Sequence, residues 1–247
     1  MQFEQLPVVS KKARFDGKKV MITGAAGVIG AGLARSFAAL GATLVLLDKR
    51  VPALERLYDE LDTLGCECIL LGLDLEGATP SDFQDVADNI KDQLGTLDSI
   101  IHCATHFKGL SLLEQADPMD WLRSMQVNVN GPFFLTQALI PVLLESKEAS
   151  VVFMMDETST QSAFWGAYGV NKWTITGVIK TWGQELEERG VKVLGIDTGP
   201  VRSAMRAEIY PGEDPKLMAD PAVVTEKIAL SLANLESLKG SGLYSAY

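Results

Sequence analysis

Two residues in the second half of the chain have types and a spacing suited to proton transfer. Tyr168 stands four residues before Lys172, at the start of a stretch with helical periodicity. Side chains at this spacing share one face of a helix, and a neighbouring ammonium would stabilise phenolate and lower the tyrosine pKa. Upstream, where a helper hydroxyl would sit at a strand end, the chain reads Met154-Met155-Asp156. The sequence therefore leaves two alternatives, a working enzyme with an altered site or a scaffold that has lost its chemistry.

A glycine-rich turn, TGAAGVIG, lies between an expected strand and an expected helix and contains Gly24, Gly27 and Gly30. Glycines here permit a tight turn, close approach of a pyrophosphate and close packing of helix on strand. The helix N-terminus would offer free N–H groups and a partial positive charge to the phosphates. An acid, Asp48, ends the second expected strand. This context predicts a nucleotide site in preference to glycines that serve only the backbone.

The acid at the end of the second strand also predicts the cofactor. The carboxylate of Asp48 would accept hydrogen bonds from both adenosine ribose hydroxyls and repel a 2′-phosphate, which favours NAD over NADP. Lys49 and Arg50 follow directly, and their charges could offset part of that repulsion. We interpret both cations as residues of a solvated loop, and NADP stays open as an alternative.

These candidate residues depend on strands and helices that alternate along the chain. Nearly continuous apolar runs predict strands at 18–24, 42–48, 66–74, 97–105, 150–156 and 191–200, with a short last strand at 242–247. Helical patterns cover 28–41, 52–65, 80–95, 118–145, 165–189 and 221–235, and 201–219 is irregular. Strands without polar alternation indicate a parallel sheet buried on both faces. The alternation predicts an α/β fold, a doubly wound parallel sheet in three layers, with an arm at 1–16 and one domain at 17–247.

Composition excludes several classes of function. A chain of 247 residues, 47% of them hydrophobic, suits one large α/β domain. Its net charge of −10 argues against nucleic acid as a partner, because an acidic surface repels phosphate backbones. We see no signal peptide and no apolar run of the ~20 residues that a membrane helix needs. Three cysteines and two histidines predict neither a disulfide framework nor a metal site, and favour a reducing compartment, the cytoplasm.

The order and spacing of these motifs resemble the short-chain dehydrogenase/reductase family. The resemblance covers about residue 15 to the end, and includes QVNVNG at 126–131 and DTGPVRSAM at 197–205. It implies a Rossmann-like fold of the compact single-domain branch, although the glycine spacing is closer to the extended branch of sugar-nucleotide epimerases. It also implies an oxidoreductase that transfers a hydride between NAD(H) and a small alcohol or carbonyl substrate.

The resemblance assigns roles to matching residues. Tyr168 resembles the general acid/base, and Lys172 resembles the lysine that supports this tyrosine and holds the nicotinamide ribose. Asn128 matches an asparagine that kinks the long helix and positions a water in a proton relay. Together with the tyrosine and the lysine, the implied cofactor-binding residues are Gly24, Gly27, Ile29, Gly30, Asp48, Asp74, Leu75, Ala104, Pro200, Val201 and Ser203.

Two departures from the family pattern bear on activity. Where the family reads Asn-Asn-Ala-Gly, this chain reads His-Cys-Ala-Thr at 102–105, and we interpret His102 as a packed structural residue. The family's serine, which orients the substrate oxygen, falls on Met155 or Asp156. Methionine makes that hydrogen bond poorly, and an ionised aspartate would repel a developing alkoxide unless it is protonated. The nearby hydroxyls that could substitute are those of Thr158, Ser159 and Ser162.

Two functional hypotheses remain open. The retained tyrosine and lysine favour an enzyme, because losing one oriented donor typically costs about 10²–10³ in rate without removing the other groups. The altered positions favour a catalytically impaired nucleotide-binding protein that acts as a sensor or assembly subunit. Residues bordering the family's substrate pocket suggest an apolar or aromatic carbonyl compound, or simply cover the core: Phe107, Leu110, Phe164, Trp165, Met205 and Tyr210.

Apolar surface on two helices predicts self-association. In the family, the helices near 118–145 and 165–189 are the usual subunit contacts. Trp173, Val178, Ile179 and Trp182 spread the apolar surface of the second helix over more than one side, and such a helix should be buried on more than one side. We therefore expect a homodimer or homotetramer.

Overall fold

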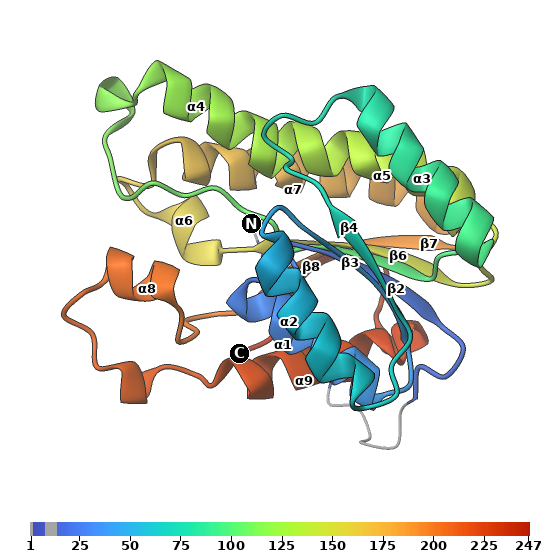
Figure 1. The fold of residues 1–247 in the computed structure, drawn as a ribbon. Coiled ribbons are helices and arrows are strands. Elements are labelled where there is room, and N and C mark those ends of the chain that lie inside the picture. The colour runs from blue at the N-terminus through green and yellow to red at the C-terminus, as the bar shows by residue number, and fades with distance from the viewer. Residues whose placement is uncertain (1, 8–13) are drawn as a thin grey trace.

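A single parallel sheet organises the protein. The computed structural model describes residues 2–7 and 14–247, in which eight strands lie in the order β1-β8-β7-β6-β5-β2-β3-β4 (Figure 1). The strands are β1 Glu4–Gln5, β2 Lys19–Thr23, β3 Thr43–Asp48, β4 Cys68–Gly72, β5 Ser99–His102, β6 Ala149–Met155, β7 Val191–Asp197 and β8 Gly242–Ser245. Every neighbouring pair is parallel. The predicted doubly wound parallel sheet is confirmed.

Helices cover both faces of the sheet (Figure 1). One face carries α1 Val28–Ala39, α2 Val51–Asp62 and α9 Pro221–Leu232. The other carries α3 Pro80–Leu94, α4 Pro118–Met125, α5 Gly131–Leu143 and α7 Gly166–Leu186. A hydrophobic core fills each of the two interfaces, because the strand residues are buried on both sides.

The chain order creates a switch point at the middle of the sheet. β2 pairs with β3 on one side and with β5 on the other, so the loops after β2 and β5 diverge from adjacent strand ends. In open α/β sheets, ligands bind in the crevice outside the carboxyl ends of strands at this point. The short helices α6, Glu157–Gln161, and α8, Ala204–Ile209, follow the carboxyl ends of β6 and β7 and lie at the same end of the sheet (Figure 1). Neither short helix was expected from the sequence.

The long helix expected over 118–145 is interrupted at its middle. α4 and α5 are joined by a π-helical segment, Gln126–Asn130, in which the N–H of Gly131 donates to the carbonyl of Gln126. Such segments contain one wide turn inside an α-helix and are frequent at functional sites. Pro132 follows the wide turn, where its missing N–H is tolerated.

Part of the expected N-terminal arm packs onto the domain. β1 extends the sheet edge beside β8, and Leu6 behind it is buried. Phe15 packs its ring edge-on against Phe37 of α1, with the ring centroids 5.0 Å apart. The division at residue 16 stays a prediction, and residues 1 and 8–13 of the arm lie outside the described residues. No helix in the described part of the chain has both the length and the apolar character needed to cross a membrane.

Candidate active site

The glycine turn forms a cradle at the carboxyl end of β2. Gly24 has a φ of +63°, and a Cβ there would lie 2.5 Å from the backbone nitrogen of Ala104. A Cβ on Gly30 would collide with the carbonyl of Gly24. Gly27 begins α1 without a side-chain cap, and the first turn of α1 contains no acidic residue. The turn can therefore approach a pyrophosphate closely and offer it free backbone N–H groups.

Two adjoining cavities meet at the segment after β5, which lines both. The first is lined by six predicted residues, Gly24, Gly27, Asp48, Asp74, Leu75 and Ala104. The second is lined by Ile29, Ala104, Tyr168, Lys172, Pro200, Val201 and Ser203. The structure thus gathers the predicted set in one continuous crevice, with two exceptions. Gly30 supports the turn from behind, and Asn128 lies outside the cavity linings.

The acid expected to contact ribose is already held by hydrogen bonds. Asp48 is buried and accepts from the backbone N–H groups of Ala26, at 3.0 Å, and Arg50, at 2.9 Å. The guanidinium of Arg50 also donates to it at 3.2 Å. Burial raises the pKa of this carboxyl, but the hydrogen bonds outweigh burial and hold the pKa below its usual value. Lys49 pairs with Asp74 at 3.4 Å, and both cations remain more than half exposed, in agreement with a solvated loop, although each also contacts a carboxylate of the crevice.

Tyr168 and Lys172 lie together on α7, as their spacing predicted. The Lys172 Nζ is 5.1 Å from the centroid of the tyrosine ring and donates to the carbonyl of Met154 at 2.6 Å. Burial lowers the pKa of Lys172 to about 8, against the opposing charge of Asp156. The pKa of Tyr168 is raised well above its usual value, first by burial and then by Asp156 and Asp197. The net shift is opposite to the lowering expected from the ammonium, because burial and two carboxylates dominate.

Asp197 is a site residue that the sequence analysis missed. It ends β7 beside Met155 of β6, is buried, and accepts from the N–H of Gly199 at 3.1 Å. Burial raises its pKa to about 6, and the neighbouring charge of Asp156 acts in the same direction. Its position at the carboxyl end of a parallel strand was the available signal, since ligand sites form there.

The position of the family's serine is filled by two very different side chains. Met155 is buried at the end of β6, and Asp156 caps α6 by accepting from the N–H of Ser159 at 3.0 Å. Of the three candidate hydroxyls, Thr158 lines the cavity. Ser159 is buried and donates to the carbonyl of Asp156 at 2.8 Å, whereas Ser162 is exposed. Thr158 is thus the hydroxyl available to replace the serine.

Asn128 fixes the loop that separates the two cavities. Its side chain accepts from the N–H of His106 at 2.7 Å and donates to the carbonyl of the same residue at 2.8 Å. The π-helical segment presents this side chain to the loop. Ser124 accepts from both Asn128 and Asn171, which connects the loop to α7.

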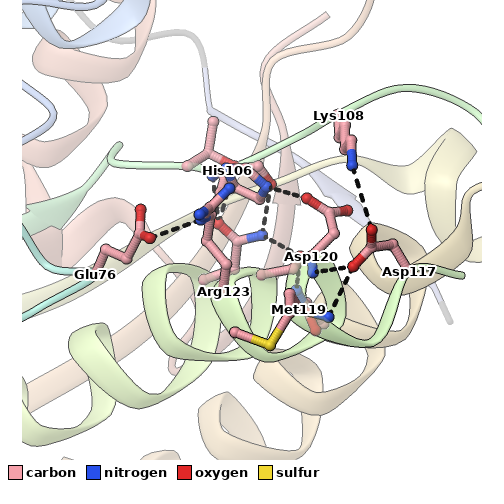
Figure 2. A network of polar contacts seen from close by, with 11 residues as sticks. Glu76, His106, Lys108, Asp117, Met119, Asp120 and Arg123 are labelled. Atoms are coloured by element: carbon pink, nitrogen blue, oxygen red, sulfur yellow. Dashed lines mark hydrogen bonds and ion pairs between the residues drawn. The ribbon is translucent and has the colours of Figure 1, made fainter.

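Charged side chains hold the same loop from outside. Figure 2 shows the His106 ring bonded to Asp120 of α4, at 2.7 Å. In the same view, Arg123 reaches Glu76 at 2.6 Å, and the ammonium of Lys108 lies 3.9 Å from an Asp117 carboxylate oxygen. α4 and its capping residue Asp117 are thereby attached to the segments on either side of the cofactor crevice.

His102 is packed, as the sequence suggested, although it also lines the cavity that contains Tyr168 and its Nδ1 has no hydrogen-bond partner among the residues that the structure describes. It is buried and stacks on Phe153 with ring centroids 4.9 Å apart, and its Nε2 is 2.8 Å from the hydroxyl of Thr136. Burial lowers the pKa of the ring to about 3, so it is neutral at physiological pH. A neutral, packed imidazole matches the interpretation made from the sequence.

Aromatic side chains form one wall around the tyrosine. Phe107 packs edge-on against Tyr168, with centroids 5.3 Å apart, and also contacts Trp165. The N–H of Ser111 donates to the carbonyl of Phe164, whose φ of 73° is unusual for a residue with a side chain. Of the expected border residues, Trp165 and Met205 line the cavity, Leu110 and Phe164 are exposed, and Tyr210 stacks on Arg206.

Comparison with known proteins agrees with this geometry. The family model described as short chain dehydrogenase matches residues 18–214. The uncharacterized oxidoreductase YciK of Escherichia coli K12 is 33% identical over 214 residues, covering 86% of this chain and 84% of that protein. A short chain dehydrogenase structure from Pseudomonas syringae has a TM-score of 0.92 at 32% identity and covers 98% of this chain and 100% of its own. A short chain dehydrogenase structure from Escherichia coli CFT073, complexed with NADPH, has a TM-score of 0.89 at 31% identity. The match covers 96% of this chain and 99% of that chain.

The matches cover nearly the whole described fold, including the glycine cradle and the Tyr168–Lys172 pair. They confirm the resemblance drawn from the sequence, together with its implication of NAD(P) as the cofactor class. The chain belongs to the short chain dehydrogenase family of NAD(P)-dependent oxidoreductases.

Proposed function

We propose that the protein transfers a hydride between NAD(H) and a small alcohol or carbonyl compound, with Tyr168 as the general acid/base. The observation that carries this proposal is one cavity holding the tyrosine ring, the Lys172 ammonium and the segment from Pro200 to Ser203. When bound, the nicotinamide of the cofactor supplies or accepts the hydride. The cradle at Gly24 and the uncapped N-terminus of α1 fit its pyrophosphate.

In the reducing direction, Tyr168 gives its proton to the substrate oxygen. Its raised pKa keeps the hydroxyl protonated at neutral pH, which suits an acid better than a base. The ammonium of Lys172, held by the Met154 carbonyl, offsets the negative charge that remains on the tyrosine oxygen. In the oxidising direction the same tyrosine must first lose its proton.

Asp48 supports a preference for NAD over NADP. Its carboxylate lies in the first cavity and would face the 2′-position of the adenosine ribose, where a phosphate would be repelled. The guanidinium of Arg50 is bonded to this carboxylate, so in the absence of a 2′-phosphate it is not a free cation. The NADPH in the related Escherichia coli structure belongs to that protein.

A homodimer or homotetramer remains our proposal for the assembly. Met119 and Leu122 on α4 and Trp173 on α7 are large apolar side chains that are 68%, 61% and 52% exposed. They lie on the two helices for which the family resemblance implied subunit contacts. A cytoplasmic location likewise stays a prediction.

The tyrosine provides the direct test. Tyr168→Phe should abolish turnover of a carbonyl panel with NADH, while NADH binding, followed by cofactor fluorescence, stays within about threefold. Tyr58→Phe on α2 is the matched control and should retain full activity. Substantial turnover by Tyr168→Phe would remove the proposed acid/base. If the wild type binds NADH but reduces no carbonyl, the hypothesis of a catalytically impaired nucleotide-binding protein replaces the enzymatic one.

A further inference from the structure

Two carboxylates in the catalytic cavity form no direct ion pair with any described residue. Asp156 follows β6 and Asp197 ends β7, and both line the cavity that contains Tyr168. Their hydrogen-bond donors are backbone N–H groups, that of Ser159 for Asp156 and those of Gly199 and Glu157 for Asp197. Among the ion pairs formed within the described residues, none includes either carboxylate. The cavity wall is therefore rich in acceptors.

The cations that line the same cavity, Lys172 and Arg206, attract these carboxylates at longer range but make their direct contacts with other groups. Lys172 donates to the Met154 carbonyl at 2.6 Å. Arg206 of α8 donates to both carboxylate oxygens of Glu213, at 2.5 and 2.7 Å, and stacks on the Tyr210 ring at 3.9 Å. Because Glu213 neutralises the arginine, one ammonium faces two carboxylates.

Other titratable groups around the two carboxylates do not compensate their negative charge. Glu157, next to Asp156, adds a further negative charge near Asp197. Cys103 beside Lys172 is a neutral thiol, because burial raises its pKa to about 12. A buried carboxylate without a counter-charge is costly, and a ligand that brings a positive charge relieves that cost.

We propose that the substrate carries a protonated amine on the carbon next to the reacting carbonyl or alcohol carbon, and that Asp156 and Asp197 bind this amine. An ammonium has three donors and no acceptor, which matches a wall of carboxylate acceptors. The same cavity is also lined by the apolar side chains of Trp165, Met205 and Ile209, which are available to a hydrocarbon or aromatic substituent. The predicted class is thus a vicinal amino alcohol and its amino ketone. This inference rests on the proposed hydride transfer.

The amine would also supply what the missing serine does not. In reduction, bound NADH would supply the hydride to the carbonyl carbon and be oxidised to NAD⁺, while Tyr168 gives its proton to the oxygen, so that C=O becomes H–C–O–H. The neighbouring ammonium keeps its own proton throughout. Its N–H and its charge lie beside the oxygen that becomes negative, where Met155 offers no donor. Preorganised donors at that position typically contribute about 10²–10³ in rate.

Matched substrates test the proposal. 2-Amino-1-phenylethanol and 1-phenyl-1-propanol differ by an ammonium in place of a methyl group. With NAD⁺ we expect the wild type to prefer the amine by about 10²-fold in kcat/KM, and Asp156→Asn and Asp197→Asn each to lower that preference about tenfold or more. Asp85→Asn, on the exposed side of α3, is the control and should leave the preference unchanged. Equal use of the two alcohols, or an unchanged preference in both active-site variants, would overturn the proposal.

A binding measurement separates this inference from the proposed chemistry. Titrating both alcohols calorimetrically into Tyr168→Phe with NAD⁺ reports recognition without turnover. Tighter binding of the amine, lost in the double variant of Tyr168→Phe with Asp156→Asn, supports the amine site even if no variant turns over. Equal binding of the two alcohols, or amine binding that survives the second change, counts against the site even if the enzyme reduces other carbonyls.

Discussion

Replacing the buried Asp197 carboxyl by an amide is expected to change how the stability of the fold depends on pH. Burial, with help from Asp156, raises the pKa of Asp197 from 3.8 to about 6 in the folded chain. Between these values the folded chain keeps a proton that the unfolded chain has released. Stability therefore falls as pH rises through this window and stays lower above it. A shift of about two pKa units corresponds to about 3 kcal/mol, at about 1.4 kcal/mol per unit.

Asp197→Asn removes this titration while keeping the size of the side chain. At about pH 4 the variant and the wild type should have nearly equal free energies of unfolding, and at about pH 7 the variant should be more stable by about 3 kcal/mol. Urea unfolding followed by tryptophan fluorescence measures the difference at each pH. The exposed Asp85→Asn variant should show no such trend. A difference between Asp197→Asn and wild type that is constant from about pH 4 to about pH 8 would refute the reasoning.

Three further predictions concern the cofactor, the assembly and the altered serine position. Asp48→Ala should narrow the gap between NADH and NADPH affinity, because it releases the Arg50 guanidinium. Arg50→Ala should weaken the binding of NADPH and leave the affinity for NADH within about threefold. If the wild type bound NADPH as tightly as NADH, the expected preference would be contradicted. Changing the exposed Leu122 and Trp173 to glutamate should yield a monomer by light scattering, and a monomeric wild type at micromolar concentration would disprove the interface. Met155→Ser should raise the rate on simple ketones by up to about 10²-fold, whereas a slower variant would show that another group already orients the substrate oxygen.

The architecture could be predicted from the sequence because strands that are buried on both faces consist of nearly continuous apolar residues. Runs such as Val20–Ile22 and Val151–Phe153 are buried without alternation, as parallel strands between two helical layers must be. The two-residue strand β1 has no such run, since its pairing depends on the distant strand β8. The resemblance implied a kink of the long helix at Asn128, but the residue types did not specify that it takes the form of a π-helical turn at Gln126–Asn130.

The parts of the candidate site that depend on backbone conformation were predictable from the sequence. The parts that depend on the electrostatic effect of distant residues were less predictable. The glycines lie in the cradle because only that residue type fits the close approach at Gly24. The pKa of Tyr168 was misjudged because Asp156 and Asp197 come from the ends of two other elements. The bond between Asp48 and Arg50 depends on the conformation of the loop, which composition does not specify.

The π-helical segment determines the relative orientation of two faces along one helical stretch. Each residue turns an α-helix by about 100°, so a wide turn with one additional residue rotates everything after it by that angle. The π-helical segment can thereby direct Asn128 toward the loop at His106 while α5 keeps Leu135 and Leu139 against the sheet. Deleting one residue from Gln126–Asn130 would complete the regular helix and turn one of these faces away from its partner. This angular offset between the residues before and after the wide turn allows one helical stretch to contact both the cofactor crevice and the core.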